Sequence, residues 1–77
     1  MEYRSAAYTG LAEIALIENK LDQVFKYSRL AQDYNRYDIR AIQYEIIANR
    51  LAGLPAQATV VLNRLIGIDP LNHFARF

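Results

Sequence analysis

Residues 52–70 read AGLPAQATVVLNRLIGIDP, and this stretch decides how the chain folds. Gly53 is expected to end one helix, because glycine readily takes the positive φ found at helix C-termini. Pro55 fits the first turn of the next helix, where the N–H that proline lacks would have no partner. Apolar residues then recur at helical spacing, at Ala58, Val61, Leu62, Leu65 and Ile66. The pattern predicts two helices joined by a tight turn.

The same signals recur along the rest of the chain, and no stretch has the alternation of a β-strand. Asn19 occupies a position where a residue with positive φ is useful, as Gly53 does. Because every connection is short, neighbouring helices are expected to be antiparallel hairpins. The sequence therefore predicts an all-α fold with helices over about 3–18, 21–34, 38–52 and 55–67.

The two predicted hairpins correspond when the chain is shifted by 34 positions. The shift aligns Asn19 with Gly53 at one turn and Asn35 with Asp69 at the other. It also aligns Ala7, Ala41 and Ala75, Tyr3 with Tyr37, and Gln23 with Gln57. Such a period is typical of helical arrays, in which each hairpin buries its apolar face on the next. We expect one domain over 1–77, with copies at about 5–38 and 39–72 and with 73–77 starting a third copy or a capping helix.

Composition excludes several kinds of protein. The 77 residues suffice for one small domain, and the absence of cysteine rules out disulfides and thiolate metal sites. The single histidine, His73, has no nucleophile or orienting carboxylate at recognisable spacing, so we expect no enzyme and no cofactor. The net charge of +1 is scattered, and no apolar run approaches the roughly 20 residues of a membrane span. We expect neither a nucleic-acid nor a membrane partner.

The second copy resembles the tetratricopeptide repeat (TPR) family. Gly53 stands at the turn between helices, Ala58 where the second helix needs a small residue, and IDPLN (68–72) at the repeat junction. The first copy diverges, with Val24 in place of alanine and Arg36 in place of proline. The resemblance implies antiparallel hairpins stacked as a short right-handed α-solenoid. Because the family's motif is degenerate, other helical repeats remain an alternative.

The resemblance also implies a binding surface. TPR proteins usually hold a protein or peptide partner in the groove lined by the leading helix of each hairpin. Carried over, that groove comprises Thr9, Glu13, Leu16, Ile17, Arg40, Gln43, Ile47 and Arg50, and it is bordered by Tyr37, Asp38 and Asn72. Arg40 and Arg50 could bind a peptide carboxylate; the alternative is that they are solvated or pair with Glu45 and Glu13. Glu13 stands where members that bind acidic chaperone tails carry asparagine, so such tails are not expected.

Tyrosine is abundant, with six residues in the chain. Two pairs are spaced seven apart, Tyr27 with Tyr34 and Tyr37 with Tyr44, and so lie two turns apart on a helix. They could line an aromatic groove for a peptide or sugar, or they could pack between helices with their hydroxyls in water. Tyr37 is the tyrosine that we expect to be an exposed contact.

A second kind of function follows from the ends of a short array. Two hairpins leave apolar surface at both ends, including Phe74 and Phe77, and such patches favour self-association. The closing DPLNHFARF resembles junctions in large bacterial multidomain proteins, which implies a segment of a longer protein. Peptide binding in the groove and assembly through the ends are therefore both open. An RNA-binding helical repeat fits less well, because it needs a basic groove and many copies.

Overall fold

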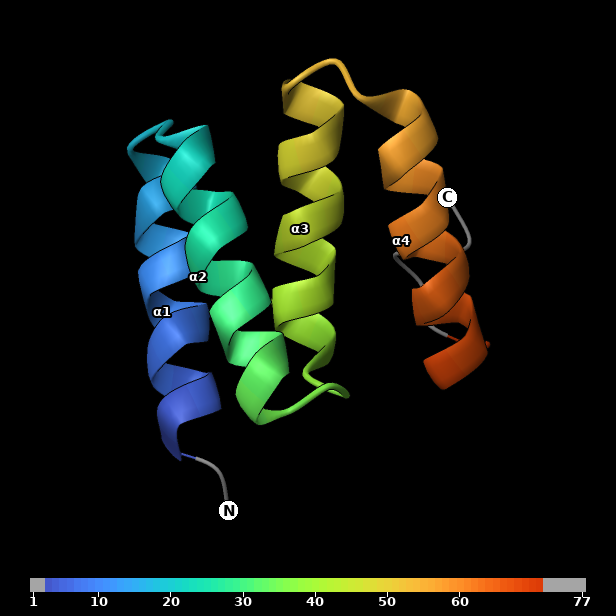
Figure 1. The fold of residues 1–77 in the computed structure, drawn as a ribbon, viewed down its shortest axis with the longest axis horizontal. Coiled ribbons are helices and arrows are strands. Elements are labelled where there is room, and N and C mark those ends of the chain that lie inside the picture. Colours follow the sequence, from blue (N-terminus) through green and yellow to red (C-terminus); the bar gives the residue numbers. More distant parts are fainter. Residues whose placement is uncertain (1–2, 72–77) are drawn as a thin grey trace.

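The structure, a computed structural model, describes residues 3–71 of the chain, and all of its regular elements within them are helices (Figure 1). The all-α prediction is confirmed, and the predicted boundaries lie within one residue of those observed. Residues 73–77, with Phe74 and Phe77, lie outside the described part. The helices are α1 (Tyr3–Ile17), α2 (Leu21–Tyr34), α3 (Ile39–Leu51) and α4 (Pro55–Ile68).

Two turns of the same geometry close the hairpins. Asn19, after α1, has a φ of 59°, and Gly53, after α3, has a φ of 75°. In both turns the next backbone amide donates a 2.8 Å hydrogen bond to the carbonyl oxygen five residues earlier. This is the pattern of the Schellman motif, which satisfies the last carbonyls of a helix. The predicted roles of Asn19 and Gly53 are confirmed.

The helices follow one another in space as they do in sequence. Helix α1 packs against α2, and α3 packs against α4. Helix α3 also packs against both α2 and α1, whereas α4 packs against α3 and reaches α2 only through the long side chain of Arg64. Figure 1 accordingly shows α3 in the middle, between the hairpin of α1 and α2 on one side and α4 on the other.

The core consists of two clusters, and α3 contributes to both. Toward α4, the buried side chains Ile42 and Ile46 of α3 meet Val61 and Leu65. Toward the first hairpin, Ala48 of α3 meets Ala15 of α1 and Val24 of α2. Side chains around the second cluster cover it further, namely Leu16, Phe25 and Tyr44. Large side chains therefore fill the contact with one helix, and small ones allow the close approach of two.

Three of the four pairs of helix boundaries repeat at an interval of 34 positions, whereas the first residues of α1 and α3, Tyr3 and Ile39, are 36 positions apart. Helices α2 and α4 both contain 14 residues, and the interval separates their first residues, Leu21 and Pro55. The last residues of α1 and α3 are separated by the same interval. The residues that follow α2 and α4 are Asn35 and Asp69, each of which donates its N–H to a carbonyl four residues earlier. The interval read from the sequence is thus present in the backbone.

The positive φ at the turn can be tested with two glycine substitutions. Gly53→Ala should lower the free energy of unfolding by about 1 kcal/mol, because a Cβ is strained at positive φ. Gly67→Ala, within α4, is the matched control, since an added Cβ meets nothing within 4 Å at either glycine. It should raise the stability by up to about 1 kcal/mol, because alanine favours a helix. Urea unfolding measures both, and equal effects would contradict the assigned turn.

Candidate functional site

The leading helices α1 and α3 are joined by a carboxylate at the start of α3. The Oδ2 atom of Asp38 accepts hydrogen bonds of 2.7 Å from both Ser5 Oγ and Thr9 Oγ1. Its Oδ1 atom accepts the Ala41 N–H at 3.1 Å, so that Asp38 also caps α3. Thr9, predicted to contact a partner, is buried, and its hydroxyl belongs to this contact between helices. We therefore leave Thr9 out of the candidate surface.

The surroundings of Asp38 favour its charged form. Partial burial on its own would raise the pKa of this carboxyl. The hydrogen bonds from Thr9, Ser5 and the Ala41 N–H, together with the charge of Arg40, outweigh that burial and lower the pKa below its usual value. Asp38 is therefore a carboxylate at neutral pH, and the ionised form strengthens the link between α1 and α3.

A second link lies on the surface that α1 and α3 share. The Arg40 guanidinium donates to Glu13 Oε2 at 3.0 Å and to Tyr44 Oη at 3.0 Å. The hydrogen bond to Tyr44 and the Glu13 carboxylate raise the pKa of Arg40, which stays charged throughout the usual pH range. Of the two interpretations of Arg40 left open by the sequence, the structure places it in the pair with Glu13. A ligand carboxylate would have to compete with Glu13 for it.

The other predicted contact residues extend along α3 from this pair. Gln43 and Ile47 are half-buried, and Arg50 is exposed in the last turn of the helix. On α1, Leu16 is half-buried and Ile17 is exposed. Tyr37 precedes α3 and is 60% exposed. We call the surface strip of Glu13, Leu16, Ile17, Arg40, Gln43, Ile47 and Arg50 the leading-helix face; three of these side chains are apolar and three are charged.

The tyrosines of the first hairpin pack on one another. Tyr8 of α1 stacks on Tyr27 with ring centroids 6.1 Å apart and on Tyr34 with centroids 5.8 Å apart. The Arg4 guanidinium lies 5.5 Å from the centre of the Tyr34 ring. Tyr27 and Tyr34 therefore pack between helices, as one of the two sequence interpretations had it. Tyr8, which joins them, carries no sequence signal of this role beyond its aromatic ring.

A different polar network connects α3 with α2 and α4. Glu45 is only 6% exposed, and its carboxylate accepts hydrogen bonds from Gln32 at 2.8 Å, Arg64 at 3.2 Å and Arg29 at 3.4 Å. Arg64 also donates to the Gln32 side-chain oxygen at 2.7 Å. The buried charge is compensated on both oxygens, as a buried carboxylate requires. The sequence offered Arg40 and Arg50 as partners of Glu45, whereas the arginines that bind it in the structure are Arg29 and Arg64.

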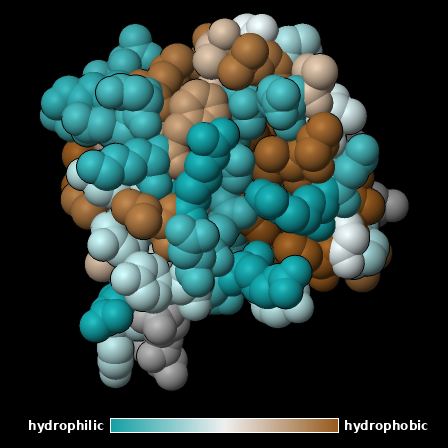
Figure 2. All heavy atoms as spheres, in the orientation of Figure 1, coloured by the Kyte–Doolittle hydropathy of each residue, from teal (hydrophilic) through white to brown (hydrophobic). Residues whose placement is uncertain are grey.

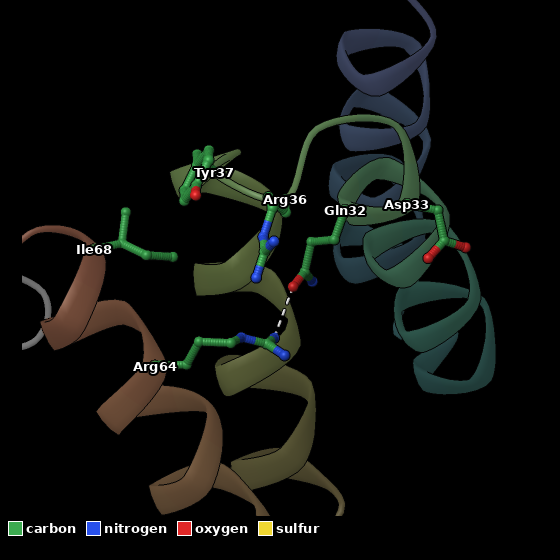
Figure 3. A pocket seen from close by; sticks show the side chains of 6 residues that line it. All are labelled: Gln32, Asp33, Arg36, Tyr37, Arg64 and Ile68. Atoms are coloured by element: carbon green, nitrogen blue, oxygen red, sulfur yellow. Dashed lines mark hydrogen bonds between the residues drawn. The ribbon is translucent and has the colours of Figure 1, made fainter.

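Above Glu45 lies a cleft, the α2–α4 cleft, with two adjoining cavities. One has a volume of about 280 Å³ and the other of about 460 Å³, and Gln32, Asp33 and Arg64 line both. Figure 3 shows Arg36 and Arg64 reaching from opposite sides toward Gln32, while Asp33 points away. Tyr37 and Ile68 line the smaller cavity on the side opposite Asp33 (Figure 3). In the view of Figure 2, hydrophilic side chains gather along the middle of the molecule, and hydrophobic ones lie over α4.

Two kinds of feature are absent from residues 3–71. No helix there is both long and apolar enough to cross a membrane. In the same residues, no group of three or more His, Cys, Asp or Glu side chains is placed to hold a metal ion.

None of the protein-family models, curated proteins or solved structures compared with the chain matches it. Only the residues themselves and their geometry therefore bear on function.

The Asp38 link predicts a pH-dependent stability. Because the folded pKa lies below the unfolded value of about 3.9, its contribution is present above that pH and is lost as the pH falls through the folded pKa. Asp38→Asn should cost about 1–2 kcal/mol at pH 7, and the cost should shrink toward pH 2.

Asp33→Asn serves as the control for this measurement, because Asp33 is exposed. It should change the stability by less than about 0.5 kcal/mol at either pH. Urea unfolding at pH 7 and pH 2 measures both variants. A cost of Asp38→Asn that is the same at both pH values would show that the carboxylate charge does not join α1 to α3.

Proposed function

We propose that the chain is a TPR-like array of two helical hairpins that binds a protein partner. Two observations support a stacked array over a closed bundle: the described helices α1 and α4 do not pack together, and three of the four pairs of helix boundaries recur at an interval of 34 positions. In a closed four-helix bundle, by contrast, the first and last helices usually pack together. A right-handed solenoid of residues 5–38 and 39–72 accounts for both observations.

The proposed docking surface is the leading-helix face, and the observation that carries it is how firmly α1 and α3 are joined. The Asp38 hydrogen bonds and the Arg40–Glu13 pair hold the two helices in one relative position. A partner then meets a preformed strip and loses less freedom on binding. Ile17, Leu16 and Ile47 supply its apolar contacts, so we propose an amphipathic helix or an extended peptide as the partner. No catalytic role is part of the proposal.

Peptide selection on the folded domain tests the docking surface. Peptides chosen from a random display library on the wild-type chain should bind at least about tenfold more weakly to the double variant Arg40→Glu, Arg50→Glu. The matched control is Lys20→Glu, Lys26→Glu, which changes the charge equally on exposed residues outside the strip. It should retain binding within about twofold.

Both double variants must first show wild-type helicity by circular dichroism, because Arg40→Glu sets a second carboxylate beside Glu13. Ile47→Ser provides a test without any change of charge. Selected peptides that bind all of these variants as tightly as the wild-type chain would rule out the leading-helix face.

Assembly of the chain with further copies is a second candidate, because the outer face of α1 is apolar and uncovered. In α3, Ala41, Glu45 and Ala48 are buried. The residues 34 positions earlier in α1 are Ala7, Leu11 and Ile14, all exposed, with Leu11 at 41% and Ile14 at 53%. Glu45 contacts the first hairpin, and Ala48 packs on it. The corresponding face of α1 therefore suits contact with a further hairpin that precedes α1 in the array.

A second copy of the chain matches this face in chemistry. Within the chain, Glu45 of α3 is bound by Gln32 of α2. The same interval of 34 positions relates Glu45 to Leu11 on α1 and Gln32 to Ile66 on α4, and Ile66 is 39% exposed. Suppose that α1 of one copy packs on α3 and α4 of another, as α3 packs on α1 and α2 within the chain. Leu11 and Ile66, both apolar, would then meet at the position where Glu45 and Gln32 meet within the chain. The arrangement would be head to tail.

Mixing two variants tests this arrangement. Leu11→Glu and Ile66→Lys should each sediment as monomers at concentrations where the wild-type chain associates. An equimolar mixture should associate again, because each partner retains one intact surface and the opposite charges attract. Val60→Lys, an exposed apolar residue elsewhere on α4, should associate like the wild-type chain. A wild-type chain that remains monomeric at millimolar concentration would exclude assembly through these faces.

A further inference from the structure

One of the three arginines in the α2–α4 cleft forms no ion pair with the other residues of the cleft. Arg29 and Arg64 both pair with the buried Glu45 carboxylate. Arg36 forms no ion pair within residues 3–71; its guanidinium lies 5.5 Å from the centre of the Tyr37 ring. Figure 3 shows it directed into the cleft, toward Gln32 and the Arg64 guanidinium. An uncompensated guanidinium that faces a second one attracts an anion.

The balance of charge in the cleft limits which anion fits. Three arginines, Arg29, Arg36 and Arg64, line the two cavities together with two carboxylates, Asp33 and Glu45. One positive charge is therefore in excess, and the Glu45 carboxylate, which lines one of the cavities, repels a doubly charged group. A monoanion such as a carboxylate meets this balance better than a phosphate, which carries about −1.5 to −2 at neutral pH.

The other residues that line the cleft indicate which kind of group lies next to the anion in a ligand. The cavity next to Arg36 is also lined by the Tyr37 ring and by Ile68, an aromatic and an aliphatic side chain on one side of it. Gln32 is already engaged on both its oxygen and its nitrogen, so it adds little further recognition. A ligand that places an apolar side chain against Tyr37 and Ile68 and a carboxylate between Arg36 and Arg64 meets both the unpaired charge of Arg36 and the apolar wall of the cavity.

We propose that the α2–α4 cleft binds a peptide carboxylate that adjoins an aliphatic or aromatic side chain, as at the C-terminus of a chain that ends in such a residue. The cavities of about 280 and 460 Å³ are close to the range of small-ligand sites, so the cleft holds the end of a partner and not a folded surface. Its residues are separate from those of the leading-helix face. The site therefore goes beyond the docking surface proposed above.

Two probes that differ only in charge test the proposal. N-acetyl-leucine carries a carboxylate beside a branched apolar side chain, and N-acetyl-leucinamide has the same shape without the charge. In ¹H–¹⁵N NMR titrations, N-acetyl-leucine should shift the amides of residues 32–37 and 64–68 in a saturable way, with a dissociation constant on the order of millimolar. The amide should leave them unchanged. Equal shifts with both probes, or no saturable shift with the carboxylate, would overturn the proposal.

Substitution of Arg36 provides the second test of the proposal. Arg36→Gln should weaken the binding of N-acetyl-leucine at least about fivefold, as loss of a charge-assisted hydrogen bond does. Lys26→Gln is the matched control, because the Lys26 ammonium also lies 5.5 Å from a tyrosine ring but outside the cleft. It should leave the binding unchanged. Unaltered binding in Arg36→Gln would overturn the assignment of the anion to this arginine.

Two further measurements separate the sources of an anion and the two proposed surfaces. Inorganic phosphate should shift the same amides less than N-acetyl-leucine at equal concentration; tighter phosphate binding would overturn the choice of a carboxylate. The double variant Arg40→Glu, Arg50→Glu should bind N-acetyl-leucine as the wild-type chain does. Failure of the leading-helix surface and failure of the cleft are therefore distinguishable.

Discussion

The fold depends on α3, which must bury two faces at once. Its small side chain Ala48 packs on Ala15 and Val24 of the first hairpin and lets the helix approach α1 and α2 closely. Its large ones, Ile42 and Ile46, face α4, and each buries enough apolar surface to contribute about 1.5–3 kcal/mol. The cluster of Ile42, Ile46, Val61 and Leu65 lies within the second hairpin, whereas the other cluster needs α3 together with α1 and α2. Removing α3 would take from α4 the helix that it packs on and would uncover the side of α1 and α2 that packs on α3.

Polar contacts on the same helix then fix how its neighbours are oriented. Apolar packing alone tolerates sliding between helices, whereas hydrogen bonds to a buried charge require one arrangement. Asp38 at the start of α3 holds α1 through Ser5 and Thr9, and Glu45 in its middle holds α2 and α4. The gain is in specificity more than in stability, because desolvation offsets much of the attraction in a buried ion pair. The two carboxylates thereby set the shapes of both candidate surfaces, the leading-helix face and the α2–α4 cleft.

Local features of this chain could be predicted from its sequence, and contacts between distant residues could not. Gly53 and Asn19 end helices through their own backbone preferences, so the turns and the interval of 34 positions between hairpins could be read directly. The bond of Thr9 to Asp38 joins residues 29 apart, and it depends on how far each helix is rotated about its axis. A shift of one position on a helix turns a side chain by about 100°, which is enough to move a residue from a surface to a contact. For that reason the sequence predicts Thr9 on the surface, and it offers Arg40 and Arg50 as partners of Glu45 in place of Arg29 and Arg64.

The two surfaces differ in what would supply their affinity. On the leading-helix face, Arg40 already has Glu13 and Tyr44 as partners, so a ligand that binds it must first break those hydrogen bonds. Exchange of one exposed ion pair for another yields little net free energy, and apolar contacts must therefore dominate binding there. In the cleft, Arg36 forms no ion pair within residues 3–71, so an arriving carboxylate does not have to displace a carboxylate of the protein from it. Binding by charge is thus favoured on one side of α3 and binding by apolar burial on the other, so one partner could use both only if it carried both features.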